Sequence, residues 1–258
     1  MAGNQGVTGL PRSVFVADGR LYRKISESPA HVELLDDLDT MIVPLAGKIE
    51  VHESAVGAVR ARLFEAGQLN SGALLIKNPY DAESYEFADR AIETFASAKY
   101  HALANLTRLL GARSVRFVEV KADRDRTGWV AKAKARIPAG GGEIDATREV
   151  TRKLEKRLEG EMAFPGATPD IAGAETYLQE RNLMGDHQMR DLIDPRTGDN
   201  PIRKYKMTVS GTRESASSFD SALKLANTGP VKALDVGASF RVTAESIRSI
   251  TLTTEITF

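Results

Sequence analysis

Glu119 and Lys121 come nearest to a catalytic motif in this chain by type and spacing. They close an apolar stretch from Ser114 to Val120 that predicts a β-strand, and residues two apart on a strand share one face. A carboxylate and a lysine placed in this way are found in metal-dependent nucleases, which also need a second carboxylate for the divalent cation. Asp81 is the only nearby candidate. The alternative interpretation is an exposed pair on a half-buried strand.

Other residue types that carry chemistry give no motif. The chain has no cysteine, which excludes disulfides and thiolate sites. Its four histidines are scattered without metal-site spacing. Gly140–Gly142 lacks the lysine and hydroxyl residue of a phosphate loop. Asp186 beside His187 could serve acid–base chemistry, but a helix N-cap is the simpler interpretation. The sequence therefore predicts neither a cofactor nor a bound metal.

A basic stretch is the best candidate for binding an anion. Its cations lie in a turn and on one face of an expected strand, close to Trp129, and are Arg124, Arg126, Lys132, Lys134 and Arg136. They could contact nucleic-acid phosphates or lipid head groups. The alternative is a solvated sheet face neutralised by Asp123 and Asp125. Because thirty-five basic residues balance thirty-five acidic ones, no global field attracts nucleic acid, and we expect it to be an unlikely partner.

The last part of the chain shows strand-like alternation in two runs, 231–244 and 249–258. We expect the two runs to pair as a long amphipathic hairpin. The apolar side of this ribbon, together with Trp129, is the candidate surface for membrane contact or assembly. Its residues are Leu234, Val236, Phe240, Val242, Ile250, Leu252, Ile256 and Phe258.

These residues must be positioned by helices and strands, whose sequence patterns predict an α+β fold. We expect an antiparallel, bent sheet, a long spine helix and inserted helices. Residues 1–78 are expected to form a small mixed lobe, with a hairpin turn at Asp18-Gly19 and a helix over 54–66. Residues 79–258 are expected to form the main domain, with the long helix over 82–110. A weak echo between 82–164 and 171–258 suggests an internal helix-strand-strand repeat.

These observations favour a non-enzymatic protein that acts by self-assembly or partner binding through long edge strands, as a homo-oligomer or with a protein partner. The first alternative is a soluble-stored membrane-acting or pore-forming protein, with a role in bacterial defence as one setting. Gasdermin-like and perforin-like proteins have that general layout, although none of their specific motifs occurs here. A nuclease and a nucleic-acid-binding module complete the hypotheses. No run of ~18 apolar residues occurs, so no membrane-spanning helix is expected. We expect a cytoplasmic location, with peripheral membrane association as the alternative.

Overall fold

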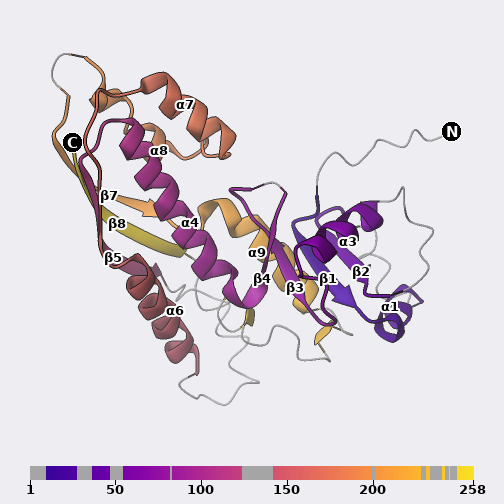
Figure 1. Ribbon diagram of the computed structural model, residues 1–258. Helices are drawn as coiled ribbons and strands as arrows, with labels where there is room; N and C mark the ends of the chain where they lie inside the picture. Colours follow the sequence, from indigo (N-terminus) through magenta and orange to yellow (C-terminus); the bar gives the residue numbers. More distant parts are fainter. Residues whose placement is uncertain are drawn as a thin grey trace. The chain divides into compact units, whose positions relative to one another are not determined.

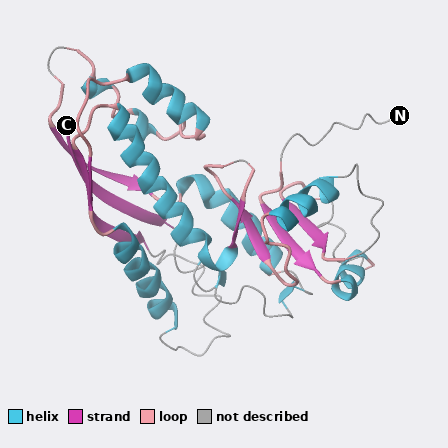
Figure 2. Cartoon of the chain, viewed as in Figure 1, coloured by secondary structure: helices cyan, strands magenta, loops and turns pink. Residues whose placement is uncertain are grey.

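The computed structural model describes residues 10–27, 37–46, 55–81, 83–123, 142–198, 201–227, 231–232, 240–241, 244 and 249–258. Helices and strands are mixed along the chain (Figure 2), and the strands form two four-stranded sheets. This architecture confirms the predicted α+β class. The chain divides into two compact units. The first contains the described residues within 1–78, 82–91 and 215–244, and the second those within 79–81, 92–214 and 245–258.

The first unit is built on a sheet with strand order β2-β1-β3-β4, in which β1 and β2 are parallel and the other pairs antiparallel (Figure 1). Its strands are β1 (Ser13–Ala17), β2 (Thr40–Pro44), β3 (Leu74–Lys77) and β4 (Tyr85–Phe87). Its helices include α1 (Gly19–Ser26), α3 (Ala55–Glu65) and α9 (Ala216–Ala226). The core cluster joins β1, β2, β3 and β4 to α3, and its buried members are Val14, Val16, Val43, Val59, Leu63, Leu75 and Tyr85.

The hairpin expected at Asp18-Gly19 is wrong. The Asp18 carboxylate accepts hydrogen bonds from the backbone N–H groups of Arg20 and Leu21, at 2.9 and 2.8 Å. It therefore acts as the N-cap of α1, and the chain after β1 continues as a helix. An aspartate followed by glycine suits both a tight turn and a helix start, so the local sequence does not separate the two.

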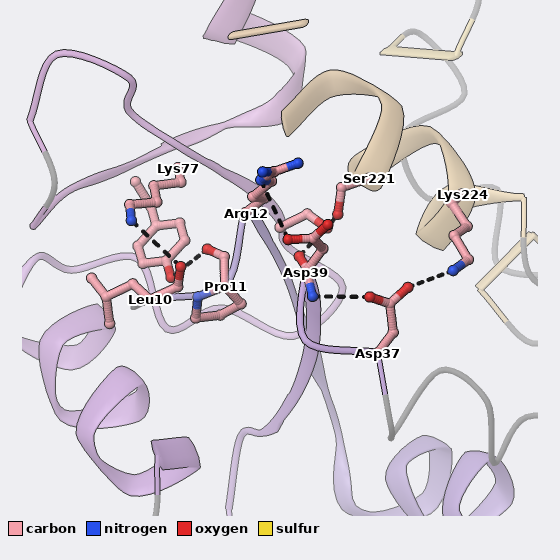
Figure 3. A network of polar contacts seen from close by, with 10 residues as sticks. Leu10, Pro11, Arg12, Asp37, Asp39, Lys77, Ser221 and Lys224 are labelled. Carbon is pink, nitrogen blue, oxygen red and sulfur yellow. Dashed lines mark hydrogen bonds and ion pairs between the residues drawn. The ribbon is translucent and has the colours of Figure 1, made fainter. Parts of the chain in front are cut away.

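Helix α9 joins the first unit from a distant part of the sequence. Figure 3 shows the polar contacts that hold it. The Ser221 hydroxyl lies 2.8 Å from the Ser13 hydroxyl and donates to the Asp39 carbonyl at 2.9 Å. Lys224 forms an ion pair with Asp37. These contacts connect α9 to β1 and to the turn that precedes β2.

The second unit is built on a sheet with strand order β6-β5-β8-β7, and all of its described pairings are antiparallel. Its strands are β5 (Ser114–Asp123), β6 (Glu161–Ala163), β7 (Lys204–Ser210) and β8 (Ser249–Thr257). Its helical elements are α6 (Gly142–Leu158), α7 (Ile171–Glu180), α8 (His187–Arg190), η2 (Asp194–Arg196), η3 (Arg213–Ser215), whose last residue falls in the first unit, and the greater part of α4 (Ala88–Leu109).

The long helix α4 packs on this sheet. The ring of Tyr100 meets Phe117 of β5 edge to face, with the ring centres 6.1 Å apart. At the end of β7, a Cβ atom on Gly211 would lie 3.1 Å from the Cβ atom of Ala96, so the helix approaches the chain closely there. The helix starts later than the predicted 82–110, because Tyr85–Phe87 pairs with β3 as a strand.

The predicted terminal hairpin is wrong. Strand β8 forms as expected, but it lies in the interior of the sheet between β5 and β7. In the expected partner run, Val231–Lys232, Phe240–Arg241 and Ala244 are helical, and the remaining residues of 231–244 lie outside the described part of the chain. Since both sides of β8 are paired, it offers no free edge. Another strand of this sheet must therefore supply the exposed edge that the sequence predicts.

Candidate functional site

Strand β7 is the edge of the second sheet on the side away from β5. The backbone N–H of Phe258 donates to the carbonyl of Arg203 at 2.8 Å, and the N–H of Gly211 donates to the carbonyl of Ile250 at 2.6 Å. Both bonds belong to the same β7–β8 register. They show which residues of β7 exchange hydrogen bonds with β8.

Bonded pairs alternate along an antiparallel ladder, so Tyr205, Met207 and Val209 bond to β8. The four even-numbered residues of β7 direct their N–H and C=O groups away from it: Lys204, Lys206, Thr208 and Ser210. Within the described residues, no strand pairs with this outer side. A row of backbone donors and acceptors is thus available to another extended segment.

The side chains of β7 divide by face. Met207 and Val209 are buried, whereas Lys204, Lys206 and Thr208 are exposed on the opposite, polar face. Tyr205 is also exposed, at 43 %. The edge therefore carries positive charge at one end and hydroxyl groups at the other. Lysines on an edge strand discourage indiscriminate strand pairing, so any partner must accommodate them.

The polar face continues across β8 onto β5. The hydroxyl groups of Thr208 and Thr253 lie 3.1 Å apart. Arg116 donates to Glu255 at 2.7 Å, and this guanidinium holds the pKa of the Glu255 carboxyl below its usual range. Lys204 and Lys206 lower the same pKa further. The face thus combines the Arg116–Glu255 ion pair with the exposed lysines of β7.

Glu119 and Lys121 lie on this face, as the sequence predicts for residues two apart. The Nζ atom of Lys121 is 3.1 Å from Oε2 of Glu119, and both side chains are about half exposed. Their partners across the sheet are Thr253 and Thr251. No group of three metal-ligating side chains occurs in the part of the chain that the structure describes. The described residues supply no such cluster to complete a cation site at Glu119, and the nuclease hypothesis stays a prediction.

An open groove lies beside β5, where the strand bulges between Phe117 and Glu119. Its volume is about 450 Å³. The groove is lined by Phe117, Val118, Arg152, Glu155, Lys156, Glu159 and Gly160. Because the lining contains two cations and two anions, it selects no particular class of ligand.

The other predicted site residues either lie outside the described part of the chain or are engaged within one of the two units. The anion-binding candidates Arg124, Arg126, Lys132, Lys134 and Arg136 lie outside the described residues, as do Trp129, Leu234, Val236 and Val242. Phe240 is buried in the first unit and packs on Phe219, with ring centres 6.2 Å apart. Ile250, Leu252 and Ile256 are fully buried in the second unit. None of these four side chains forms a surface in the described structure.

Phe258 is also engaged within its own unit. The guanidinium of Arg196 lies over the Phe258 ring, 4.1 Å from its centre. Arg196 Nε donates to the carbonyl of Leu110 at 3.0 Å, and its NH1 group donates to the carbonyl of Ile202. Burial lowers the pKa of Arg196. The terminal ring therefore covers a buried arginine that ties the end of α4 to the start of β7.

A second cluster of chemically reactive side chains is buried in the same unit. Lys99 of α4 is fully buried, and its Nζ atom forms ion pairs with Asp186, which is 2 % exposed, and with Glu214, at 2.7 Å. The Tyr80 hydroxyl donates to the other oxygen of Glu214 at 3.2 Å. The Tyr80 ring also faces the ammonium group, 5.9 Å away.

The chemistry of this cluster is structural. Two carboxylates face one ammonium group, so the cluster carries excess negative charge that hydrogen bonds must offset. Tyr80 supplies one, and the backbone N–H of Met189 supplies another to Asp186, at 3.1 Å. Burial, reinforced by Glu214 and Asp186, raises the pKa of Tyr80 and keeps its hydroxyl group protonated. An ammonium group without exposed surface cannot reach a substrate.

Sequence reasoning missed most of the buried cluster. The N-cap expected at Asp186 is confirmed, because its carboxylate caps α8. The same carboxylate also holds Lys99, and the partner imagined for it, His187, contacts Arg190 instead, at 3.1 Å. The available signal was Lys99 itself, a charged residue that occupies a position of the apolar stripe, four residues after Phe95 and four before Leu103. Buried lysines are rare unless paired, but no local pattern names the partners.

No protein-family model, no curated protein and no solved structure matches this chain. Among the described residues, no helix combines the length and the apolar character that crossing a membrane requires.

Proposed function

We propose that this is a non-enzymatic protein that acts by pairing the outer edge of β7 with another extended polypeptide segment. The observation that carries the proposal is the row of backbone groups at Lys204, Lys206, Thr208 and Ser210, which point away from β8. Addition of a strand to such an edge gives affinity through main-chain hydrogen bonds, and alternate side chains give specificity.

The side chains of this edge support a selective partner. Lys204 and Lys206 are exposed on one face, and Tyr205 is exposed on the other. A pairing strand can place acidic or hydroxyl groups beside the lysines and an apolar residue beside the tyrosine. Cross-strand pairs of these kinds each contribute roughly 0.2–1 kcal/mol. Lysine against lysine is unfavourable, so the edge discriminates among partners.

The buried polar cluster supports a scaffold rather than an enzyme. Its ammonium group is enclosed, and Glu119 and Lys121 neutralise each other on an open face. Helix α4 packs on this sheet, and β7 forms one of its edges. A rigid edge loses little conformational entropy when a strand is added.

Hydrogen exchange on the purified full chain tests the proposal. The probe is a short synthetic peptide of alternating valine and glutamate, which places carboxylates opposite the lysines. We expect it to slow exchange of the outward backbone amides of Lys206 and Thr208 in dilute protein. The amides of Tyr205 and Met207, already bonded to β8, serve as the internal reference.

The control peptide has the same sequence with every backbone amide N-methylated, so neither of its edges can donate hydrogen bonds to β7. It should give no protection. Unchanged exchange at Lys206 and Thr208 with saturating unmethylated peptide would overturn the proposal. The proposal also fails if these amides are already slow in dilute protein without peptide, since another segment of the chain would then occupy the edge.

A further inference from the structure

We infer that the strand which pairs with β7 is β7 of a second copy of this chain, antiparallel to it and centred on Met207. This inference rests on the proposed function and names the partner. The two-fold relation would join the sheets of two second units into one continuous sheet. The direction of the backbone groups and the order of charges along β7 carry it.

Backbone geometry restricts the possible registers. The even-numbered residues of β7 direct their N–H and C=O groups outward, where no described strand pairs with them, so an even residue must face an even residue across the new pair. Centring on Met207 satisfies this condition. Lys204 then faces Ser210, and Lys206 faces Thr208, with the reciprocal pairs generated by the two-fold axis. All seven residues of β7 are paired in this register.

Like charges exclude one neighbouring register, and unpaired residues disfavour the other. Centring on Lys206 would set this lysine directly against its own copy, which is destabilising. Centring on Thr208 would leave Lys204 and Tyr205 without a partner in the facing strand. The register centred on Met207 avoids both defects, because every lysine faces a hydroxyl group. It also sets the exposed Tyr205 opposite Val209, an aromatic and β-branched pair of a favourable type.

Two substitutions at Thr208 test the register by a reversal of sign. Thr208 is exposed, and its hydroxyl group contacts that of Thr253, so Thr208→Glu and Thr208→Lys remove the same intramolecular hydrogen bond. In the proposed dimer, residue 208 faces Lys206 of the second copy twice. Glutamate there creates two opposite-charge pairs, and lysine creates two like-charge pairs.

Sedimentation of the full-length protein over a dilution series measures the dimer. We expect the dissociation constant to fall about fivefold for Thr208→Glu and to rise about fivefold for Thr208→Lys, because each dimer contains two cross-strand pairs. Interactions of residue 208 with Glu255 of its own chain occur in monomer and dimer alike and cancel from this constant. Raising the salt concentration should shrink the difference between the two variants.

The outcomes separate the inference from the function on which it rests. A wild-type protein that stays monomeric at every concentration, yet shows peptide protection of Lys206 and Thr208, keeps the proposed function and overturns the second copy as partner. A dimer whose dissociation constant moves in the same direction for both variants overturns the register centred on Met207. Absence of both dimer and peptide protection overturns the function together with the inference.

Discussion

The Nζ atom of Lys99 lies 2.7 Å from Oε1 of Glu214, and the lysine side chain has no exposed surface. Glu214 belongs to the turn after β7, and the second partner of the lysine, Asp186, caps α8. One ammonium group thus joins α4 to two segments that are distant in sequence. The junction lies next to the sheet edge, because η3 begins three residues after the last residue of β7, Ser210.

Replacing Lys99 by methionine should lower the free energy of unfolding by roughly 3–5 kcal/mol, because it leaves two buried carboxylates without their cation. Urea denaturation followed by circular dichroism measures the loss. Lys153→Met is the matched control, since Lys153 makes ion pairs with Glu149 and Glu93 while its own side chain is half exposed. That change should cost less than about 1 kcal/mol. Equal losses in the two variants would contradict the structural role given to the buried cluster.

Gly111 ends α4 in a conformation that an L-residue rarely adopts, with φ of +83°. A Cβ atom at this position would lie 2.2 Å from the carbonyl oxygen of Ala167. Gly111→Ala should therefore destabilise the protein by at least about 2 kcal/mol, since both backbone strain and a clash with main chain are introduced. The melting temperature measured by calorimetry reports the change.

Gly185→Ala is the control for Gly111→Ala. A Cβ atom added at Gly185 would have open space within 4 Å, and this glycine has no positive φ. Its substitution should change the free energy of unfolding by no more than about 0.5 kcal/mol. A Gly111→Ala protein as stable as Gly185→Ala would show that the segment around Ala167 can move away from the end of α4.

Elements with a strong local signal were predictable from the sequence. The helix expected over 54–66 is α3, and the strand expected from Ser114 to Val120 is the first part of β5. In each case the periodicity and the flanking glycine or polar residues agree on one structure. Gly67, with φ of +66°, ends the helix segment as its position predicts.

The failures come from pairings that no local pattern specifies. Alternation over 231–244 suits a strand, but β5 and β7 occupy both sides of β8. The described residues of 231–244 are helical and belong to the first unit. The partners of Lys99 come from two remote segments. The position of β7 at the edge of the described sheet is likewise a property of strand order, which the sequence of β7 alone does not contain.

The ion pair between Asp37 and Lys224 predicts a dependence of stability on pH. The hydrogen bond from Lys224 holds the pKa of the Asp37 carboxyl below its ordinary value of 3.8. In the unfolded chain the carboxyl group regains that ordinary value and binds a proton more readily. The pair therefore stabilises the folded state fully above about pH 3.8, and this contribution is lost as the pH falls from there through the lower folded pKa.

Substituting Asp37 by asparagine should remove this part of the acid sensitivity while leaving the contact between Ser221 and the Asp39 carbonyl in place. Urea denaturation from pH 2 to pH 7 compares the variant with the wild type. We expect the wild type to be the more stable protein at neutral pH and the difference to shrink as the pH falls below about 3.8. Lys224→Met should flatten the profile in the same way, since it removes the partner that lowers the pKa. A constant difference across the whole pH range would contradict this account, because it would show that the charge of Asp37 does not contribute to the stability of the folded state.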